Sequence, residues 1–535
     1  METADIHHLE IVLLFLMGLV AALAALARRF HTPYPIVLVI GGLAVSLLPN
    51  MPRVSLNPDV VFLILLPPLL FSAAYHTSWR DFRLNFGGIL MLAFGLVGFT
   101  ATALAYISGW LLPGFDRRSG FVLGALVAST DAIAATAIAR RVGLPQRIID
   151  VLEGESLVND ATSLLALEFS VAMLVSNQVP TLAAGVLRVI YLALAGTLLG
   201  LVMGWLIRLG QARLSDAPIE ITLALAAPYL SYIAAESVKA SGVLATVACG
   251  LYLGHKRAQS LSMRARLDSA AVWNTLDFVL NGLTFILIGM QLPHILAGIR
   301  SLSLPALLFD GALLAAVLIG LRMTWVFAES WIAHAMRRLI KRPAPSVPGK
   351  ETFIVGWTGM RGVIALAAAI SLPELLDDGT AFPQRDVLIF LTFCVILVTL
   401  VVQGLSLPLL IRKLGLAGTA GENVEESQAR RQMLSAAIGE LHRIRSTAVS
   451  EDDEILVDLL HHYQQRLEEA NTVFAARTPD AGNYEEHRRL ESRLRAVERS
   501  TILRLRDQNK INDKLFRSLE RELDLLDARN LPAHP

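Results

Sequence analysis

Residues 148–175 read IIDVLEGESLVNDATSLLALEFSVAMLV, an apolar run that is long enough to cross a bilayer and has a polar cluster near its middle. A charged side chain at the centre of a membrane costs roughly 2.5–3.5 kcal/mol on insertion scales, so it needs a partner or a function. This stretch therefore predicts a membrane helix that carries a functional site.

The composition of the whole chain favours a membrane protein. Of its 535 residues, 54% are hydrophobic and only 17% are charged, whereas soluble domains carry about 25% charged residues. The apolar body covers residues 1–415, and residues 416–535 form a polar tail. The formal net charge of +1 gives no indication of a nucleic-acid partner. Cys249 and Cys394 lie in apolar stretches and are expected to be core residues without a disulfide.

The body contains about thirteen apolar segments. They lie near 9–27, 34–49, 58–75, 85–112, 119–139, 148–175, 189–207, 218–235, 241–254, 272–292, 305–333, 352–372 and 386–411. Only helices and closed barrels satisfy backbone groups in lipid, and these runs lack the alternation of barrel strands. The sequence therefore predicts an all-α polytopic membrane protein.

Loop charges predict its orientation. Basic residues gather in alternate loops, among them Arg28, Arg29, Arg140 and Arg141, and such loops face the cytoplasm. The N-terminus lacks a basic leader region, so the run at 9–27 is expected to be a retained first span. We therefore expect the N-terminus outside and the tail inside.

The tail is expected to be helical and cytoplasmic. Apolar residues recur there at helical spacing among many charges, which is typical of soluble amphipathic helices. The examples are Ile455, Leu459 and Tyr463, and Leu490, Leu494 and Val497.

Two predicted spans are interrupted. Ser129-Thr130-Asp131 breaks the run at 119–139, and Gly359 and Gly362 flank Arg361 in the run at 352–372. Charge-bearing interruptions in two halves of a membrane protein are typical of a transporter's site near the bilayer midplane.

The polar cluster in 148–175 offers oxygen ligands to a small cation. Helical spacing places Ser156 and Asp160 on one face, with Glu155 and Asn159 on an adjacent strip. Thr130 and Asp131 can add a hydroxyl, a second carboxylate and free backbone carbonyls. Burial favours a protonated carboxylate and a bound cation favours an ionised one, so protons and cations would compete for the same oxygens.

Two arginines lie inside predicted spans. Arg322 is expected to form a structural ion pair with Glu155, and Arg361 is expected to offset exposed helix-end dipoles at its break. Asp277 and Asp310 are expected near helix ends.

The chain resembles the monovalent cation/proton antiporters, a family that includes bacterial sodium/proton antiporters of the NhaP type and animal sodium/proton exchangers. Each motif that carries the resemblance is weak by itself, but their succession in this order is specific. The motifs lie at 65–71 (LLPPLLF), 129–132 (STDA), 154–161 (GESLVNDA), 285–292 (FILIGMQL), 359–362 (GMRG) and 402–404 (VQG).

The resemblance implies a fold. It implies about thirteen helices in inverted repeats, with two broken helices that cross, and a homodimer. Scaffold helices would lie at about 9–75 and 189–292, and ion-carrying core helices at about 85–175 and 305–411. The core would move against the scaffold like an elevator, in a bacterial plasma membrane.

The resemblance also implies roles for single residues. Asp160 matches the essential carboxylate, and Asn159 matches the asparagine of electroneutral members. Thr130, Asp131 and Ser156 match positions of the cation site. Glu155 with Arg322 matches the buried ion pair, and Arg361 matches the arginine at the second break. Family members often carry a carboxylate four residues after the double proline, where this chain has Ser72.

These observations predict one-for-one exchange of sodium, or lithium, for protons in pH and sodium homeostasis. The expected ligands of the transported cation are Asp160, Asp131, Thr130 and Ser156, and no cofactor is expected. A potassium/proton antiporter on the same scaffold remains an alternative. An intramembrane aspartyl protease using Asp131 and Asp160 is disfavoured, because its Tyr-Asp and Gly-x-Gly-Asp patterns are missing. A channel is disfavoured, because a pore does not require paired titratable groups at broken helices.

Overall fold

The computed structural model describes residues 3–30, 32–48, 58–175, 182–214, 216–299, 303–339, 349–376, 380–417, 421–447 and 453–475, with single positions between 497 and 523. The chain divides into two compact units, Met1–Ala417 and Gly418–Pro535. Each is described here by itself.

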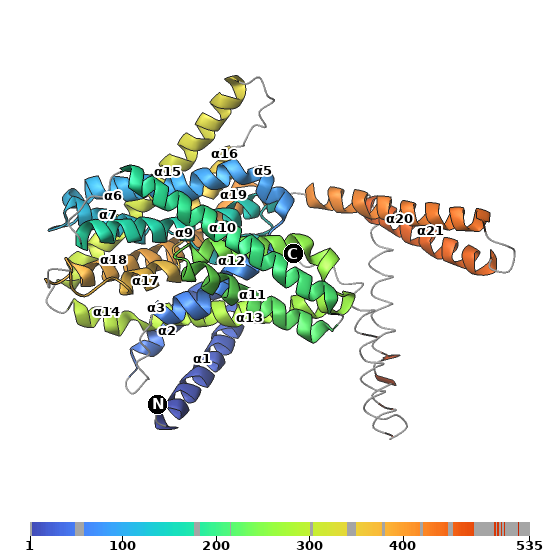
Figure 1. Ribbon diagram of the computed structural model, residues 1–535, viewed down its shortest axis with the longest axis horizontal. Helices are drawn as coiled ribbons and strands as arrows, with labels where there is room; N and C mark the ends of the chain where they lie inside the picture. The colour runs from blue at the N-terminus through green and yellow to red at the C-terminus, as the bar shows by residue number, and fades with distance from the viewer. Residues whose placement is uncertain are drawn as a thin grey trace. The chain divides into compact units, whose positions relative to one another are not determined.

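The first unit is a helical bundle (Figure 1). The label η marks a π-helix. From the N-terminus to Val175 the helices are α1 (Thr3–Arg29), α2 (Tyr34–Ser46), α3 (Pro58–Val60), η1 (Val61–Leu65), α4 (Leu66–His76), α5 (Trp79–Leu90), η2 (Met91–Leu96), α6 (Val97–Leu111), α7 (Arg117–Leu126), α8 (Ala132–Val142) and α9 (Gln146–Val175). The others are α10 (Leu182–Arg213), α11 (Ala217–Ser237), α12 (Gly242–Ser260), α13 (Met263–Met290), α14 (Leu292–Gly298), α15 (Leu304–Leu339), α16 (Gly349–Trp357), α17 (Val363–Ile370), α18 (Arg385–Val398), η3 (Thr399–Gln403) and α19 (Gly404–Leu414).

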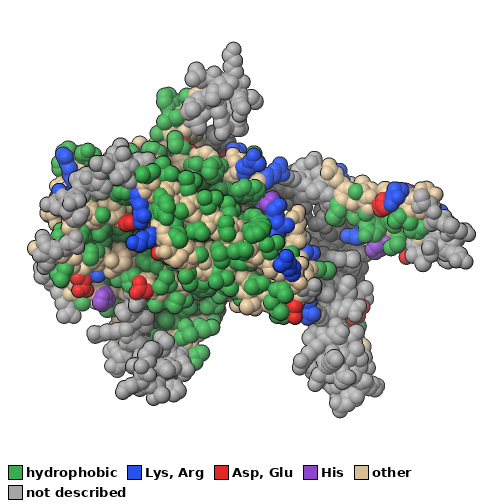
Figure 2. Space-filling model, viewed as in Figure 1, with side chains coloured by type: hydrophobic (Ala, Val, Ile, Leu, Met, Phe, Trp, Pro, Cys, Tyr) green, Lys and Arg blue, Asp and Glu red, His purple; other side chains and the backbone are tan. Residues whose placement is uncertain are grey.

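The predicted all-α membrane fold is confirmed for the described residues. Nine of their helical stretches are long and apolar enough to cross a membrane. Hydrophobic side chains cover most of the face of this unit seen in Figure 2, and large ones such as Trp110 and Trp331 are exposed. An apolar surface of this extent suits contact with lipid.

Four predicted segments fall outside those nine stretches. The segment at 34–49 is the 13-residue helix α2, and the one at 241–254 lies within α12. The segments at 119–139 and 352–372 are each divided into two short helices. The number of thirteen spans therefore remains a prediction. A criterion based on helix length misses the two divided segments because each of their helices is short.

The first divided segment consists of α7 and α8. The backbone leaves the helix between Leu126 and Ala132, and α8 begins where the Asp131 carboxylate accepts a hydrogen bond from the Ile133 amide at 2.8 Å. An aspartate at this position satisfies one of the free amides at the start of a helix. The local sequence therefore both breaks the span and restarts it.

The second divided segment consists of α16 and α17, and its break contacts the first. The Asp131 amide donates to the Met360 carbonyl at 2.8 Å. A Cβ added at Gly362 would collide with the Asp131 side chain, so glycine is needed there for the two breaks to approach. The predicted pair of broken helices is confirmed, and the two breaks are in contact.

The helices of the first unit pack in two sets. In one set, α2 packs on α13, α4 on α12, and α10, α11 and α12 pack side by side (Figure 1). In the other, α7 packs on α6 and α9, and α15 packs on α16 and α18. Helix α13 contacts α17, and α4 contacts α9, so the two sets meet along these helices.

Helices α2 and α13 touch through their backbones. A Cβ added at Gly42 would collide with the Ile286 carbonyl, and one added at Gly289 would collide with the Val39 carbonyl. Glycine on both helices therefore permits a separation that no side chain would allow.

The two cysteines are free and buried, as predicted. Asp310 lies in the second turn of α15, close to a helix end as predicted. The same prediction for Asp277 is wrong, because α13 begins at Met263 and continues to Met290. Asp277 therefore lies midway along a long helix, since α13 extends well before the apolar segment that begins at 272.

The second unit contains α20 (Gly421–Thr447) and α21 (Asp453–Ala475), which pack on each other as a hairpin (Figure 1). The predicted helical tail is confirmed for these residues. In α21, Leu456 and Leu460 are buried, whereas Leu459 is 39% exposed. Val497 is exposed, and Leu490 and Leu494 lie outside the described residues.

Candidate functional site

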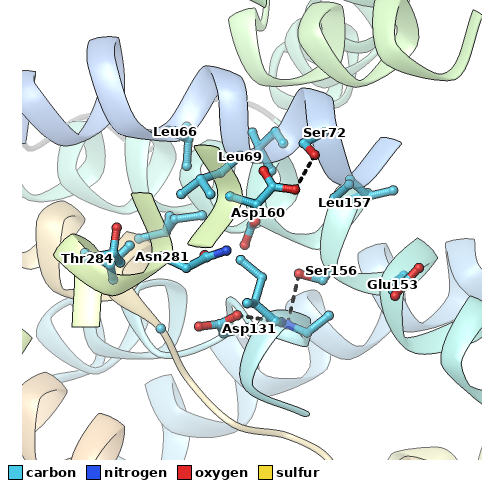
Figure 3. A pocket seen from close by; sticks show the side chains of 18 of the residues that line it. Leu66, Leu69, Ser72, Asp131, Glu153, Ser156, Leu157, Asp160, Asn281 and Thr284 are labelled. Atoms are coloured by element: carbon cyan, nitrogen blue, oxygen red, sulfur yellow. Dashed lines mark hydrogen bonds between the residues drawn. The ribbon is translucent and has the colours of Figure 1, made fainter. Parts of the chain in front are cut away.

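A cavity of about 330 Å³ lies between the two sets of helices. Its walls come from η1 and α4, from the break before α8, from α8 and α9, from α13, and from the start of α17. Asp131, Ser156 and Asp160 line it from one set (Figure 3). Ser72, Asn281 and Thr284 line it from the other.

Asp160 is buried in this cavity. Its side chain is 3% exposed, and its Oδ1 accepts a hydrogen bond from the Ser129 hydroxyl at 2.6 Å. Among the described residues no arginine or lysine forms an ion pair with it. A carboxylate held in this way can take up a proton or a cation as its counter-charge.

Asn159 connects α9 to the first break. Its Nδ2 donates to the Thr130 hydroxyl at 2.9 Å and to the Ala128 carbonyl at 3.4 Å. Its Oδ1 is buried and has no hydrogen-bond partner within the described ranges. Asn159 therefore fixes the shape of the break next to Asp160 and leaves one amide oxygen for a ligand.

Ser156 joins the same break one turn earlier. Its hydroxyl donates to the Thr130 carbonyl at 3.0 Å and accepts from the Ala132 amide at 3.3 Å. Asp131 lines the cavity beside it, with one oxygen held by the start of α8. The structure thus brings Asp131 and Ser156 to the same cavity wall as Asp160.

Glu155 and Arg322 form a buried ion pair between α9 and α15. Arg322 Nη1 and Nη2 donate to Glu155 Oε1 and Oε2 at 2.5 and 2.8 Å, and both side chains are almost fully buried. The Thr130 hydroxyl also donates to Glu155 Oε1, at 3.1 Å. Two-pronged geometry of this kind is the strongest form of an arginine–carboxylate contact.

Arg361 binds backbone carbonyls of the first break, just beyond the end of α7 at Leu126. Its Nη1 donates to the carbonyls of Ala128 and Ser129, at 2.6 and 3.0 Å. The carbonyl end of a helix carries partial negative charge, so a buried guanidinium stabilises it. Arg361 thereby ties the second break to the first.

Taken together, the cavity presents carboxylate, hydroxyl and amide oxygens at the contact between two helix breaks. Hard oxygen ligands of this kind suit alkali-metal cations and protons better than transition metals.

The sequence matches a protein family over most of the first unit. The family described as sodium/hydrogen exchanger, transmembrane, matches residues 12–413. The chain belongs to the sodium/hydrogen exchanger family.

Several known proteins are similar to this exchanger. It is 32% identical to an uncharacterized Na⁺/H⁺ exchanger of Mycobacterium tuberculosis, over 97% of this chain and 96% of that protein. It is also 32% identical to the sodium, potassium, lithium and rubidium/H⁺ antiporter of Bacillus subtilis, over 75% of this chain and 61% of that protein. The sodium proton antiporter MjNhaP1 of Methanocaldococcus jannaschii shares the fold, with a TM-score of 0.60, 18% identity, and coverage of 75% of this chain and 97% of that one.

These matches establish a multi-pass membrane protein that exchanges cations for protons. The family consists of transporters, so the protein is grouped with antiporters and not with enzymes.

Sequence reasoning missed several residues of the exchanger's cavity. Ser129 was recognised as part of a motif but not as the partner of Asp160. Asp277, Asn281 and Thr284 were not predicted to line the cavity. Their spacing of four and three residues was the available signal, since it places them on one face of a helix.

Ser72, at the position where the resemblance implies a carboxylate, also lines the cavity. Its hydroxyl donates to Asp277 Oδ2 at 2.5 Å. Asp277, which lies on a different helix, therefore contacts the position at which the resemblance implies a carboxylate.

Proposed function

We propose that this exchanger carries one sodium or lithium ion in exchange for one proton, in pH and sodium homeostasis. The observation that carries the proposal is the buried Asp160 carboxylate, which contacts Ser129 at the first helix break. Asn159 holds that break beside it through Thr130, and Thr130, Asp131 and Ser156 complete the proposed ligands of the transported cation.

Competition for Asp160 would couple the two fluxes. When a cation lies against the ionised carboxylate, a proton cannot occupy the same oxygens, and a protonated Asp160 has little affinity for a cation. Each crossing of the membrane then carries either a cation or a proton.

Asn159 supports a one-for-one exchange. An amide does not titrate, so the pair at positions 159 and 160 carries at most one exchangeable proton. We expect sodium-driven proton movement in proteoliposomes to be independent of an imposed membrane potential. Exchange that speeds up or slows down with the sign of that potential would rule out the one-for-one ratio.

The position of the cavity supports an elevator mechanism. One wall comes from α4 and α13, within the proposed scaffold at 9–75 and 189–292, and the opposite wall comes from α8, α9 and α17, within the proposed core at 85–175 and 305–411. Movement of the core along the scaffold would expose Asp160 to each side in turn. We propose this movement within a homodimer, which the resemblance implies.

The charge of the loops supports the proposed orientation. Arg140 is 44% exposed and pairs with Glu153 at 2.6 Å, and both line the cavity. Loops rich in basic residues face the cytoplasm, so we propose that the part of the cavity lined by Arg140 and Glu153 opens to the cytoplasm of a plasma membrane. The N-terminus would lie outside and the tail inside.

The choice of cation is tested by dissipation of a pH gradient in vesicles that contain the purified protein. We expect sodium and lithium to dissipate the gradient at lower concentrations than potassium. A response to potassium alone would favour the second candidate, a potassium/proton antiporter. That candidate has support in the Bacillus subtilis relative, whose name includes potassium and rubidium.

A further inference from the structure

The wall of the cavity formed by α13 carries three polar side chains in a row. Asp277, Asn281 and Thr284 are spaced by four and three residues, so they share one face of the helix. Asn281 points into the cavity from one side and Ser156 from the other (Figure 3). At 1.5 Å per residue the row extends over about 10 Å.

Each of these side chains has an oxygen without a partner. Asp277 Oδ1, Asn281 Oδ1 and Thr284 Oγ1 are buried and accept or donate no hydrogen bond within the part of the chain that the structure describes. Asn281 is only 7% exposed and Thr284 only 3%. Burying polar groups in this way is costly unless a ligand satisfies them.

Asp277 is held in place by a neutral partner. Its Oδ2 accepts from Ser72, and the Ser72 backbone carbonyl contacts His76 Nδ1 at 2.8 Å. No lysine or arginine of the described residues forms an ion pair with Asp277. Its oxygens are therefore available to a mobile cation.

We propose that Asp277, Asn281 and Thr284 form a second station for the transported monovalent cation, a row of oxygens whose neighbouring members the cation contacts in turn, on the wall of the cavity that faces Asp131 and Asp160. The inference rests on the proposed function and adds a binding step to it. A cation that enters past Glu153 and Arg140 exchanges part of its hydration shell for these oxygens before it reaches Asp160. Ser72 positions Asp277 and does not bind the cation itself.

The test is the sodium dependence of exchange in proteoliposomes. Asp277→Asn keeps the shape of the side chain and removes its charge. We expect the KM for sodium to rise about tenfold, in line with the loss of one charged ligand, while the maximal rate stays within about twofold. Asp277→Glu, which retains the charge, should restore most of the affinity.

A matched control lies on the same helix. Asp268 pairs with Arg264 at 3.8 Å, is 46% exposed and does not line the cavity, so Asp268→Asn should leave the KM unchanged. Thr284→Val removes one neutral oxygen at constant shape and should raise the KM about threefold, which keeps the test decisive even if Asp277→Asn folds poorly.

An unchanged KM in folded Asp277→Asn, or in Thr284→Val if Asp277→Asn does not fold, would overturn the second station. So would a maximal rate that falls to background in folded Asp277→Asn, since Asp277 would then belong to the exchange centre itself. If the wild-type protein exchanges sodium for protons and these variants behave like it, only this inference fails. If the wild-type protein shows no exchange, the proposed function fails with it.

Discussion

Asp160→Asn is expected to reduce sodium-dependent proton movement in proteoliposomes to background. Asparagine has nearly the same shape and can still accept the hydrogen bond from Ser129, so the protein should fold. The amide can neither release a proton nor neutralise a cation. Because both halves of the exchange depend on that one carboxylate, both should stop together. The measurement is the dissipation of a vesicle pH gradient after sodium is added.

Asp150→Asn provides the control for this variant. Asp150 lies on the same helix, is buried, and accepts from Gln146 Nε2 at 2.8 Å, but does not line the cavity. It should exchange at close to the wild-type rate. Clear sodium-dependent exchange in folded Asp160→Asn would show that the carboxylate at the break is not the shared site.

Arg322→Leu is expected to have the largest effect on stability. It leaves Glu155 buried with its charge uncompensated, because among the described residues Arg322 is its only ion-pair partner. Removing one partner of a buried pair costs about 3–5 kcal/mol. The expected result is a large fall in the thermal unfolding temperature of the detergent-purified protein.

Two further variants separate this cost from other effects of the substitution. Arg140→Leu breaks the exposed pair with Glu153 and should cost only about 0–1 kcal/mol. The double variant Arg322→Met with Glu155→Gln removes both charges and should recover much of the lost stability. If Arg322→Leu unfolds at the wild-type temperature, the pair does not hold α9 to α15.

The membrane fold could be predicted because it depends on local properties. Apolar length identifies the spans, and the polar stretch at 129–131 with the glycines around Arg361 identifies the two breaks. These features act within a single segment, so no knowledge of neighbouring helices is required.

The sequence predicts the part of the site that lies within one segment, but not the part that depends on contacts between helices. Asn159 and Asp160 stand out because polar residues in the middle of a span are rare, and the structure places them beside Thr130. The cavity wall on α13 depends on the rotation of that helix and on its neighbours. The sequence alone does not specify that Ser72, about 200 positions earlier in the chain, contacts Asp277.

The backbone contact between α2 and α13 constrains how mutations can accumulate in this protein. With Gly42 against Ile286 and Gly289 against Val39, even alanine at either position would push the two helices apart. The displacement would be passed along α13 to Thr284 and Asn281, which lie five and eight residues before Gly289, before any polar residue had changed. Substitution at these two glycines is therefore constrained by contact between backbones, although neither residue lines the cavity.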